Sequence, residues 1–212
     1  MRRGRLVVIS GPSGVGKTTV CRELLRLPGL ERVVTCTTRP PRAGEVDGKD
    51  YHFLSEDEFE EGVRAGAFLE HARVHGHLYG TPRGQVERGL SEGKDMILAI
   101  DVQGAAQIRR ALGTSKRLPS AELVTVFLEP PDWKELERRL VSRGTDKPAD
   151  VAARLAAAER ELRESADYDL KVANVEVERT VREILDHLGY EQGTMPGTGT
   201  GGETGAPSGK AG

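Results

Sequence analysis

The stretch that decides the fold is Leu6-Val7-Val8-Ile9-Ser10-Gly11-Pro12-Ser13-Gly14-Val15-Gly16-Lys17-Thr18. Its first part, residues 6–9, is a continuous run of apolar and mostly β-branched residues, which predicts a buried strand. Its second part, residues 11–18, fits the pattern G-x-x-x-x-G-K-[ST] and leads into a helical pattern over residues 16–27. A strand, a glycine-rich turn and a helix in this order predict a loop that wraps its backbone around a chain of phosphates.

The chemistry of this loop follows from its residue types. Glycines let successive backbone N–H groups point inward at an anion, and the positive end of the following helix dipole adds to the attraction. Lys17 supplies a point charge for the β- and γ-phosphates, and the Thr18 hydroxyl is a ligand for Mg²⁺. A chance glycine-rich turn is the alternative, and the flanking strand and helix argue against it. We expect a nucleoside triphosphate to bind residues Gly11, Pro12, Ser13, Gly14, Val15, Gly16, Lys17, Thr18 and Thr19.

Further short apolar runs alternate with helical patterns along the chain. Residues 96–100 and 123–128 predict buried strands, and residues 169–173 predict a weaker fourth strand. Helices are predicted between them at residues 104–112, 132–141 and 177–188. Continuous apolar strands separated by helices predict an α/β fold, with a mainly parallel sheet covered by helices on both faces.

Three segments depart from this alternation. Residues 32–93 contain the proline-rich turn Arg39-Pro40-Pro41-Arg42, aromatic residues and two predicted short helices, so we interpret them as an inserted lobe. Residues 148–165 predict a long, charged, alanine-rich helix with little apolar surface, which is typical of an exposed and mobile element. From residue 191 onward Gly, Thr, Pro and Ser dominate, and we expect residues 191–212 to form a disordered tail.

The bulk composition indicates a globular protein. A chain of 212 residues can form one core that carries inserted lobes, and a formal net charge of −2 provides no general attraction to nucleic acid. Cys21 and Cys36 lack metal-ligand spacing and are expected to be idle thiols in a reducing compartment. No apolar segment approaches the ~18 residues that a membrane span needs. We therefore predict a cytoplasmic protein without a membrane or nucleic-acid partner.

An acidic residue follows the strand predicted at residues 96–100. Asp101 would lie at the carboxyl edge of the sheet, where open α/β proteins bind ligands. Phosphate-binding loops of this kind work with such an acid near Mg²⁺, so Asp101 is a candidate metal ligand beside Thr18. The alternative is an N-cap aspartate for the next helix, and the two roles can coexist.

A second cluster of phosphate-binding residue types lies in the inserted lobe. Arg39 and Arg42 flank the two prolines, which reduce the entropy of holding guanidinium groups in place for bidentate contact with phosphate oxygens. Tyr51 and Tyr79 follow, and each can donate a phenolic hydrogen bond to the same phosphate. A pair of solvated surface arginines is the alternative.

Seven blocks of sequence together resemble the guanylate kinase family. They occur in the order found in that family and cover about residues 4 to 188. The blocks are Gly11–Thr18, Thr37-Thr38-Arg39-x-x-Arg42-x-Gly44-Glu45, Gly48-Lys49-Asp50-Tyr51, Phe68-Leu69-Glu70-His71-Ala72, Leu78-Tyr79-Gly80-Thr81, Ile100-Asp101-x-Gln103-Gly104 and Arg143-Gly144-Thr145.

The resemblance implies how the lobe binds GMP. It implies that the GMP phosphate is held by Arg39, Arg42, Tyr51 and Tyr79, and that the guanine is read by Glu70, Thr35 and Thr81, with Asp101 also in the substrate site. The chemistry agrees, because guanine presents N1–H and N2–H₂ as adjacent donors that one carboxylate accepts together. Adenine lacks both donors and would leave that carboxylate unpaired.

The resemblance also implies a lid that closes over the transferring phosphates. It implies that Arg139, Arg143 and Arg154 of this lid contact those phosphates. The alternative is salt bridging along exposed helices with Glu135 and Glu159. Asn174 matches a family position beside the adenine of ATP, and the alternative there is a simple turn asparagine.

The resemblance therefore implies a kinase that transfers the γ-phosphoryl group of ATP to GMP or dGMP with Mg²⁺, without an obligatory protein partner. It divides the chain into a core (4–31, 94–131 and 166–190), a GMP lobe (32–93) and a lid (132–165). Ala99 replaces an acid that relatives often have, and residues 113–121 are expected to form a lengthened surface loop. Two rival hypotheses are a protein-binding module without catalysis and a kinase that phosphorylates a ribose bisphosphate; the intact loop and Glu70 argue against them.

Overall fold

The computed structural model describes residues 4–74, 76–114, 122–141 and 148–190. A five-stranded parallel sheet forms its centre, with the order β2-β7-β1-β8-β9. These strands are β1 (Arg5–Ser10), β2 (Leu30–Arg32), β7 (Asp95–Ala99), β8 (Glu122–Glu129) and β9 (Leu170–Ala173). The α/β fold predicted from the alternating pattern is thereby confirmed.

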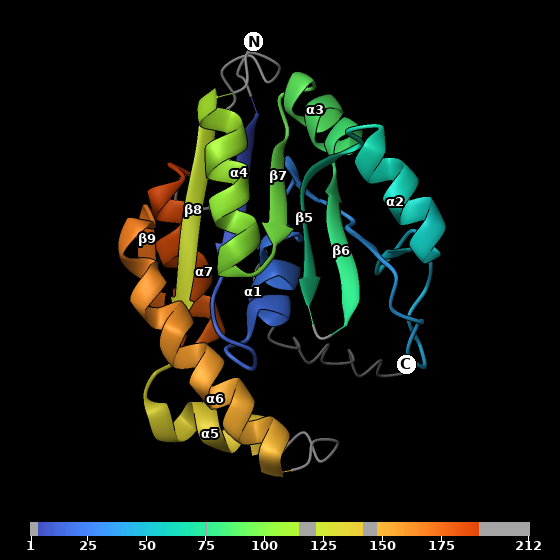
Figure 1. Cartoon of the computed structure of the whole chain (residues 1–212). Helices are drawn as coiled ribbons and strands as arrows, with labels where there is room; N and C mark the ends of the chain where they lie inside the picture. The colour runs from blue at the N-terminus through green and yellow to red at the C-terminus, as the bar shows by residue number, and fades with distance from the viewer. Residues whose placement is uncertain (1–3, 75, 115–121, 142–147, 191–212) are drawn as a thin grey trace, which may run out of the picture.

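Helices cover both faces of this sheet (Figure 1). One face carries α1 (Lys17–Leu24) and α7 (Val177–His187), and the other carries α3 (Arg83–Ser91) and α4 (Val102–Thr114). Along β1, Val7 and Ile9 join the core cluster under α1 and α7, whereas Leu6 and Val8 join the cluster under α3 and α4. The continuous apolar run of β1 is therefore explained by burial on both faces.

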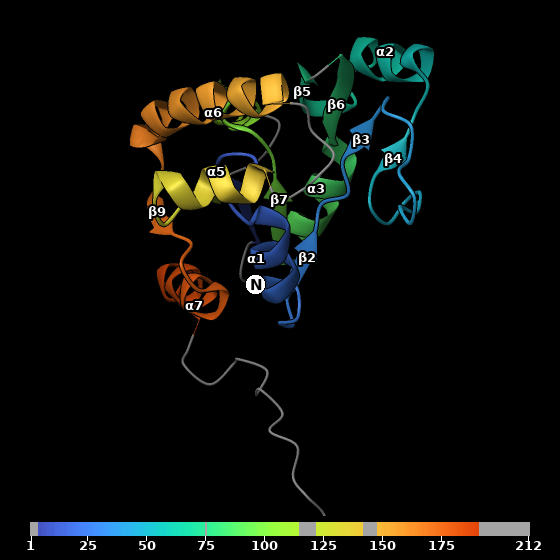
Figure 2. The same cartoon turned by 90° about the horizontal axis from the view of Figure 1, so that it is seen from below.

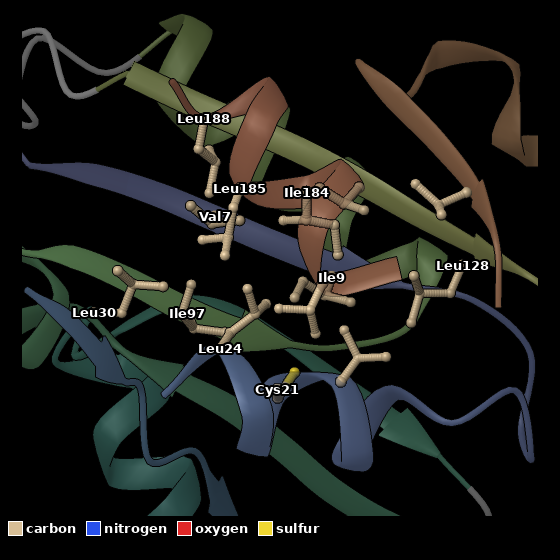
Figure 3. Packing of buried hydrophobic residues seen from close by; sticks show 14 of the residues in the cluster. Val7, Ile9, Cys21, Leu24, Leu30, Ile97, Leu128, Ile184, Leu185 and Leu188 are labelled. Carbon is tan, nitrogen blue, oxygen red and sulfur yellow. The ribbon is translucent and has the colours of Figure 1, made fainter. Parts of the chain in front are cut away.

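The cluster under α1 and α7 is shown from close by in Figure 3. Side chains of β1 and β7 interdigitate there with Leu24 of α1 and with Ile184 and Leu185 of α7. Cys21 lies in the same cluster, and burial raises the pKa of its thiol to about 12. Cys36 is also buried and free, so both thiols are inert, as the sequence predicted.

A second sheet of four strands lies beside the first, with the order β4-β3-β6-β5. Its strands are β3 (Cys36–Thr37), β4 (His52–Phe53), β5 (Phe68–Val74) and β6 (His77–Pro82), and α2 (Glu56–Arg64) packs on it through Phe59. Phe59 and Phe68 stack with ring centroids 4.5 Å apart. The sequence predicted the two helices of this region but neither this sheet nor β2.

Two further helices lie below the carboxyl ends of the parallel strands (Figures 1 and 2). They are α5 (Trp133–Val141) and α6 (Pro148–Arg163), which is followed by a 3₁₀ turn at Glu164–Asp167. The two helices pack against each other through Leu136, Leu140 and Ala158. They correspond to the segment expected to act as a lid.

Several predicted boundaries were wrong by a few residues. Helix α1 ends at Leu24 rather than residue 27, and the proline at position 28 disfavours helical geometry at residue 27. Helix α4 runs from Val102 to Thr114, so it is longer at both ends than the predicted 104–112 and includes the start of the expected loop 113–121.

The division into core, lobe and lid stays a prediction. The second sheet and α2 occupy residues 36–82, whereas Val86 and Leu90 of α3, which was assigned to the lobe, belong to the core cluster of the parallel sheet. The predicted tail at residues 191–212 lies outside the described residues. Among the described helices, none combines the length and apolarity of a membrane span.

Candidate nucleotide-binding site

The glycine-rich loop between β1 and α1 depends on two glycines that have no space for a side chain. Gly16 has φ 105°, and a Cβ there would lie 2.5 Å from Nδ2 of Asn174. A Cβ on Gly11 would lie 2.4 Å from the carbonyl oxygen of Leu128 in β8. Glycine is therefore required at both positions, because the loop is pressed between the ends of β8 and β9.

Lys17 opens helix α1 and bends back over the loop. Its Nζ donates to the carbonyl oxygens of Gly11 and Pro12, the second at 3.1 Å. The first turn of α1 holds no acidic residue, so no carboxylate there competes with an anion for the positive helix end. A cavity of ≈ 590 Å³ opens here, lined by Ser13, Gly14, Gly16, Lys17, Thr18, Thr19, Arg139, Asn174, Val175 and Val177.

Asn174 comes directly after β9 and supports the loop from behind. Its Nδ2 donates to the Val15 carbonyl oxygen at 2.8 Å, and its Oδ1 accepts from the Thr180 hydroxyl at 2.9 Å. The side chain is buried and also lines the cavity. Sequence reasoning proposed adenine binding or a simple turn for Asn174 and missed this supporting contact, which joins residues 159 positions apart.

The lid helices bring two of the three predicted arginines to the loop. Nη1 of Arg139 donates to the Val15 carbonyl oxygen at 3.3 Å, and Nη1 of Arg154 donates to the Ser13 hydroxyl at 3.4 Å. Arg143 lies outside the described residues. The alternative of helix-surface pairing also applies to Arg139, because its Nε donates to Glu135 at 2.7 Å.

Glu135 anchors the arginines at the start of the lid. Its hydrogen bonds from Arg138 and Arg139, both at 2.7 Å, lower the pKa of its carboxyl to about 2. The carboxylate is therefore ionised throughout the neutral and mildly acidic pH range. Glu159 pairs with Arg163 instead of Arg154, and Arg154 is directed to Ser13.

The lid also supplies a carboxylate that sequence reasoning missed. Glu161 lies seven residues after Arg154 and thus on the same face of α6. Its Oε2 is buried and has no hydrogen-bond partner among the described residues. Burial raises the pKa of its carboxyl to about 7, the positive charge of Lys17 lowers it, and Asp101 raises it further. The charged, alanine-rich composition of residues 148–165 had suggested an exposed helix.

Asp101 lies where the sequence predicted it, at the carboxyl edge of the sheet. Its Oδ1 accepts from the backbone N–H of Gly104 at 2.8 Å, so it caps α4. The second oxygen is not used in this cap. The register of β1 and β7 pairs Ile9 with Ala99, which places Asp101 and the start of the loop at the same edge. Both proposed roles of Asp101 are therefore compatible.

Just after β3 of the second sheet, Arg39 lies among aromatic side chains. Its guanidinium carbon is 5.5 Å from the ring centroid of Tyr51, whose ring lies 6.1 Å from that of Tyr79. A hydrogen bond to Glu45 raises the pKa of Arg39, burial lowers it, and a hydrogen bond to Tyr79 raises it. The structure thus brings together Arg39, Tyr51 and Tyr79, while Arg42 is exposed at the same turn.

A buried carboxylate faces α4 from strand β5. Glu70 is 5% exposed, and its Oε1 accepts from the Thr81 hydroxyl at 2.5 Å. A Cβ on Gly104 would lie 3.0 Å from Oε2 of Glu70, so this glycine leaves room for the carboxylate. Burial raises the pKa of Glu70 to about 7, against the opposing hydrogen bond of Thr81, and Asp101 raises it further.

The two threonines predicted to contact guanine differ in their surroundings. The Thr81 hydroxyl donates to Glu70 rather than to an acceptor on the guanine ring, so Thr81 fixes the position of the Glu70 carboxylate. Its oxygen keeps lone pairs for a donor on the base. Thr35 is partly buried before β3, and its carbonyl oxygen accepts from the backbone N–H of His52 at 2.9 Å.

The arrangement thus has two clusters of groups of the kind that bind anions, one on the loop and one around Arg39, and a buried hydrogen-bond acceptor at Glu70. A family model described as guanylate kinase matches residues 3–190. The chain belongs to the guanylate kinase family. It is a kinase that transfers a phosphoryl group from ATP to GMP.

Individual relatives agree with this assignment to the guanylate kinase family. The guanylate kinase of Symbiobacterium thermophilum is 47% identical over 183 residues, which are 86% of this chain and 83% of the relative. That of Thermotoga maritima is 45% identical over 191 residues, which are 90% of this chain and 88% of the relative. The crystal structure of guanylate kinase from Anaplasma phagocytophilum superposes with a TM-score of 0.72 at 30% identity, covering 92% of this chain and 90% of that one.

Proposed function

We propose that the chain transfers the γ-phosphoryl group of ATP to GMP and dGMP by positioning and charge neutralisation alone. The observation that carries this proposal is the buried Glu70, which is held by Thr81, two residues along β6 from Tyr79 of the Arg39 cluster. A carboxylate has about four acceptor sites, so Oε1 can accept from Thr81 and still pair, together with Oε2, with the adjacent N1–H and N2–H₂ donors of guanine. No contact in this assignment involves the 2′-hydroxyl, so dGMP is an acceptor as well.

The transfer needs no general base, because the GMP phosphate is already an anionic nucleophile. Arg39, Arg42, Tyr51 and Tyr79 would hold that phosphate in line with the triphosphate on the loop. Lys17, Arg42, Arg139, Arg143 and Arg154 would then spread and neutralise the charge on the moving group. Lys17 must leave its carbonyl partners in the loop to do so, and the phosphates are the stronger partners for its charge.

The oxygen donors at the carboxyl edge of the sheet fit Mg²⁺. Thr18 and the second oxygen of Asp101 would hold the ion together with nucleotide phosphates and water, which is the coordination that Mg²⁺ prefers. Among the described residues, no cluster of three or more His, Cys, Asp or Glu could hold a metal without the nucleotide. When bound, Mg²⁺ neutralises charge on the β- and γ-phosphates.

A coupled assay tests this assignment against its two rivals. Purified protein is offered ATP with GMP, dGMP, AMP, CMP, UMP or a ribose bisphosphate, with and without Mg²⁺. We expect turnover of GMP and dGMP only, and only with Mg²⁺. Absence of turnover with every acceptor would favour a protein-binding module without catalysis. Turnover of the ribose bisphosphate would show that the assignment of Glu70 as a guanine-binding residue is wrong. The cytoplasmic location and the absence of an obligatory partner stay predictions.

A further inference from the structure

One acidic side chain connects the two arginines that are proposed to hold the acceptor phosphate. Oε1 of Glu45 accepts from Nη2 of Arg39 at 2.8 Å. Oε2 of the same carboxylate accepts from the backbone N–H of Arg42 at 2.7 Å. The backbone N–H of Glu45 donates in turn to the Arg42 carbonyl oxygen at 3.0 Å. Glu45 therefore closes the proline-rich turn and fixes the Arg39 side chain at the same time.

These contacts differ from an ordinary ion pair on the surface. The Arg39 and Glu45 side chains are only 11% and 20% exposed, whereas the pairs along the helix surfaces are mostly more open. The hydrogen bond from Arg39 is the main cause that lowers the pKa of Glu45, against a smaller effect of burial. Nη1 of Arg39 donates to the Pro40 carbonyl oxygen at 2.7 Å, so both terminal nitrogens have fixed partners.

The arrangement orients the guanidinium plane of Arg39. Glu45 and the Pro40 carbonyl hold its two terminal nitrogens, and its guanidinium carbon lies 5.5 and 6.0 Å from the ring centroids of Tyr51 and Phe53. A long side chain that is already ordered loses little entropy when a phosphate binds. Without its partners, Arg39 would have to be ordered by GMP itself, at the expense of affinity.

We infer that Glu45 is a positioning residue for the acceptor phosphate, because it holds Arg39 and the Arg42 turn in the geometry that binds GMP. The inference rests on the proposed role of these two arginines. It makes a prediction of unusual sign, since Glu45 is itself negative. If Glu45 acted only by Coulomb repulsion, removing its carboxylate would tighten the binding of a phosphate beside it. If Glu45 positions Arg39 and the Arg42 turn, the same removal weakens the binding.

The test measures equilibrium binding of GMP and of guanosine by calorimetry in the absence of ATP. In Glu45→Ala we expect the Kd for GMP to rise at least about tenfold, because two ordered side-chain contacts are lost. Guanosine lacks the phosphate, so its Kd should stay within about twofold. Glu45→Gln keeps one acceptor oxygen and should give an intermediate value. The matched control is Glu60→Ala, which removes an exposed pair with Arg64 in the same lobe and should change neither ligand.

A second variant separates the inference from the role of the arginines. In Arg39→Ala the Kd for GMP should rise, and adding Glu45→Ala to it should have less effect than Glu45→Ala alone, because the partner is already gone. GMP binding in Glu45→Ala that equals or exceeds that of the wild type overturns the inference, as does an equal loss of guanosine binding. If Arg39→Ala itself binds GMP normally, the phosphate site lies elsewhere and the proposed role of Arg39 fails.

Discussion

Replacing Glu70 by Gln tests the assignment of the guanine reader through stability as well as catalysis. The carboxylate is buried, it accepts one hydrogen bond from Thr81, and the pKa of its acid rises to about 7 mainly because of burial. A carboxamide has nearly the same shape but no charge. The substitution therefore removes the buried charge without leaving a cavity.

The magnitude for stability follows from the pKa. In the unfolded chain Glu70 releases its proton near 4.5, whereas in the folded chain it keeps the proton until about 7. Between these values the folded state binds more protons, so the free energy of unfolding falls as pH rises. At ~1.36 kcal/mol per pH unit, the full difference amounts to roughly 3 kcal/mol. Above pH 7 the variant should be more stable than the wild type by up to about this amount, and below pH 4.5 the two should be alike.

The same substitution is expected to impair catalysis, although it stabilises the fold. The amide offers guanine one acceptor and one misplaced donor, so one charge-assisted hydrogen bond is lost and two donors face each other. We expect kcat/KM for GMP to fall by about 2–4 kcal/mol, or roughly 30- to 1,000-fold. AMP should gain relative to GMP, and ATP affinity should stay unchanged because the loop at residues 11–18 is not touched.

The assay combines thermal unfolding at pH 5 and pH 8 with kcat/KM for both monophosphates. Glu61→Gln, the same chemical change at an exposed position of α2, is the matched control and should leave Tm and turnover unchanged. A variant that is less stable than the wild type at pH 8 would refute the reasoning about burial. Undiminished turnover of GMP would show that the guanine reader lies elsewhere.

Three further predictions concern the lid, the loop and the sheet. Arg154→Ala and Arg143→Ala should each lower kcat about 100-fold or more with little change in nucleotide affinity, as steady-state kinetics would report; a rise in KM alone would contradict the lid role. Asn174→Ala should weaken ATP binding about tenfold in calorimetry and leave GMP binding unchanged, because about 1–2 kcal/mol of support for the Val15 carbonyl is lost. Asp95→Ala breaks a buried pair with Arg5 at 2.6 Å and should lower the free energy of unfolding in urea by about 3–5 kcal/mol, whereas Glu31→Ala, which removes an exposed partner of Lys94, should lower it by less than about 1 kcal/mol.

Local patterns accounted for the parallel sheet apart from its edge strand β2, and for the loop. The run over residues 6–9 is apolar on both sides because helices cover both faces of β1. A continuous apolar run can be recognised in the sequence without knowing which elements pack against the strand. The loop at residues 11–18 is equally local, since glycines, a lysine and a threonine at fixed spacing suffice to predict its chemistry.

The second sheet could not be predicted in the same way. Strands β3 and β4 have two residues each, which is too short for an alternating pattern. β3 gains its identity as a strand from pairing, for example of Cys36 with Gly80. The polar residues of β5 also hide its strand character, because Glu70 is buried beside Thr81 while His71 and Arg73 are exposed beside Phe59 and Glu56 of α2.

The amino-acid sequence by itself determined the fold class, the phosphate-binding loop and, through its resemblance to guanylate kinases, the candidate residues of the acceptor site. Only the tertiary structure decided what those residues contact: Asn174 supports the loop, Thr81 donates to Glu70, and Glu45 joins Arg39 to the turn of Arg42. The physical reason is the separation along the chain between the groups that interact. Backbone periodicity and loop chemistry depend on neighbours along the chain, whereas hydrogen-bond partners, burial and pKa depend on groups that only folding brings together.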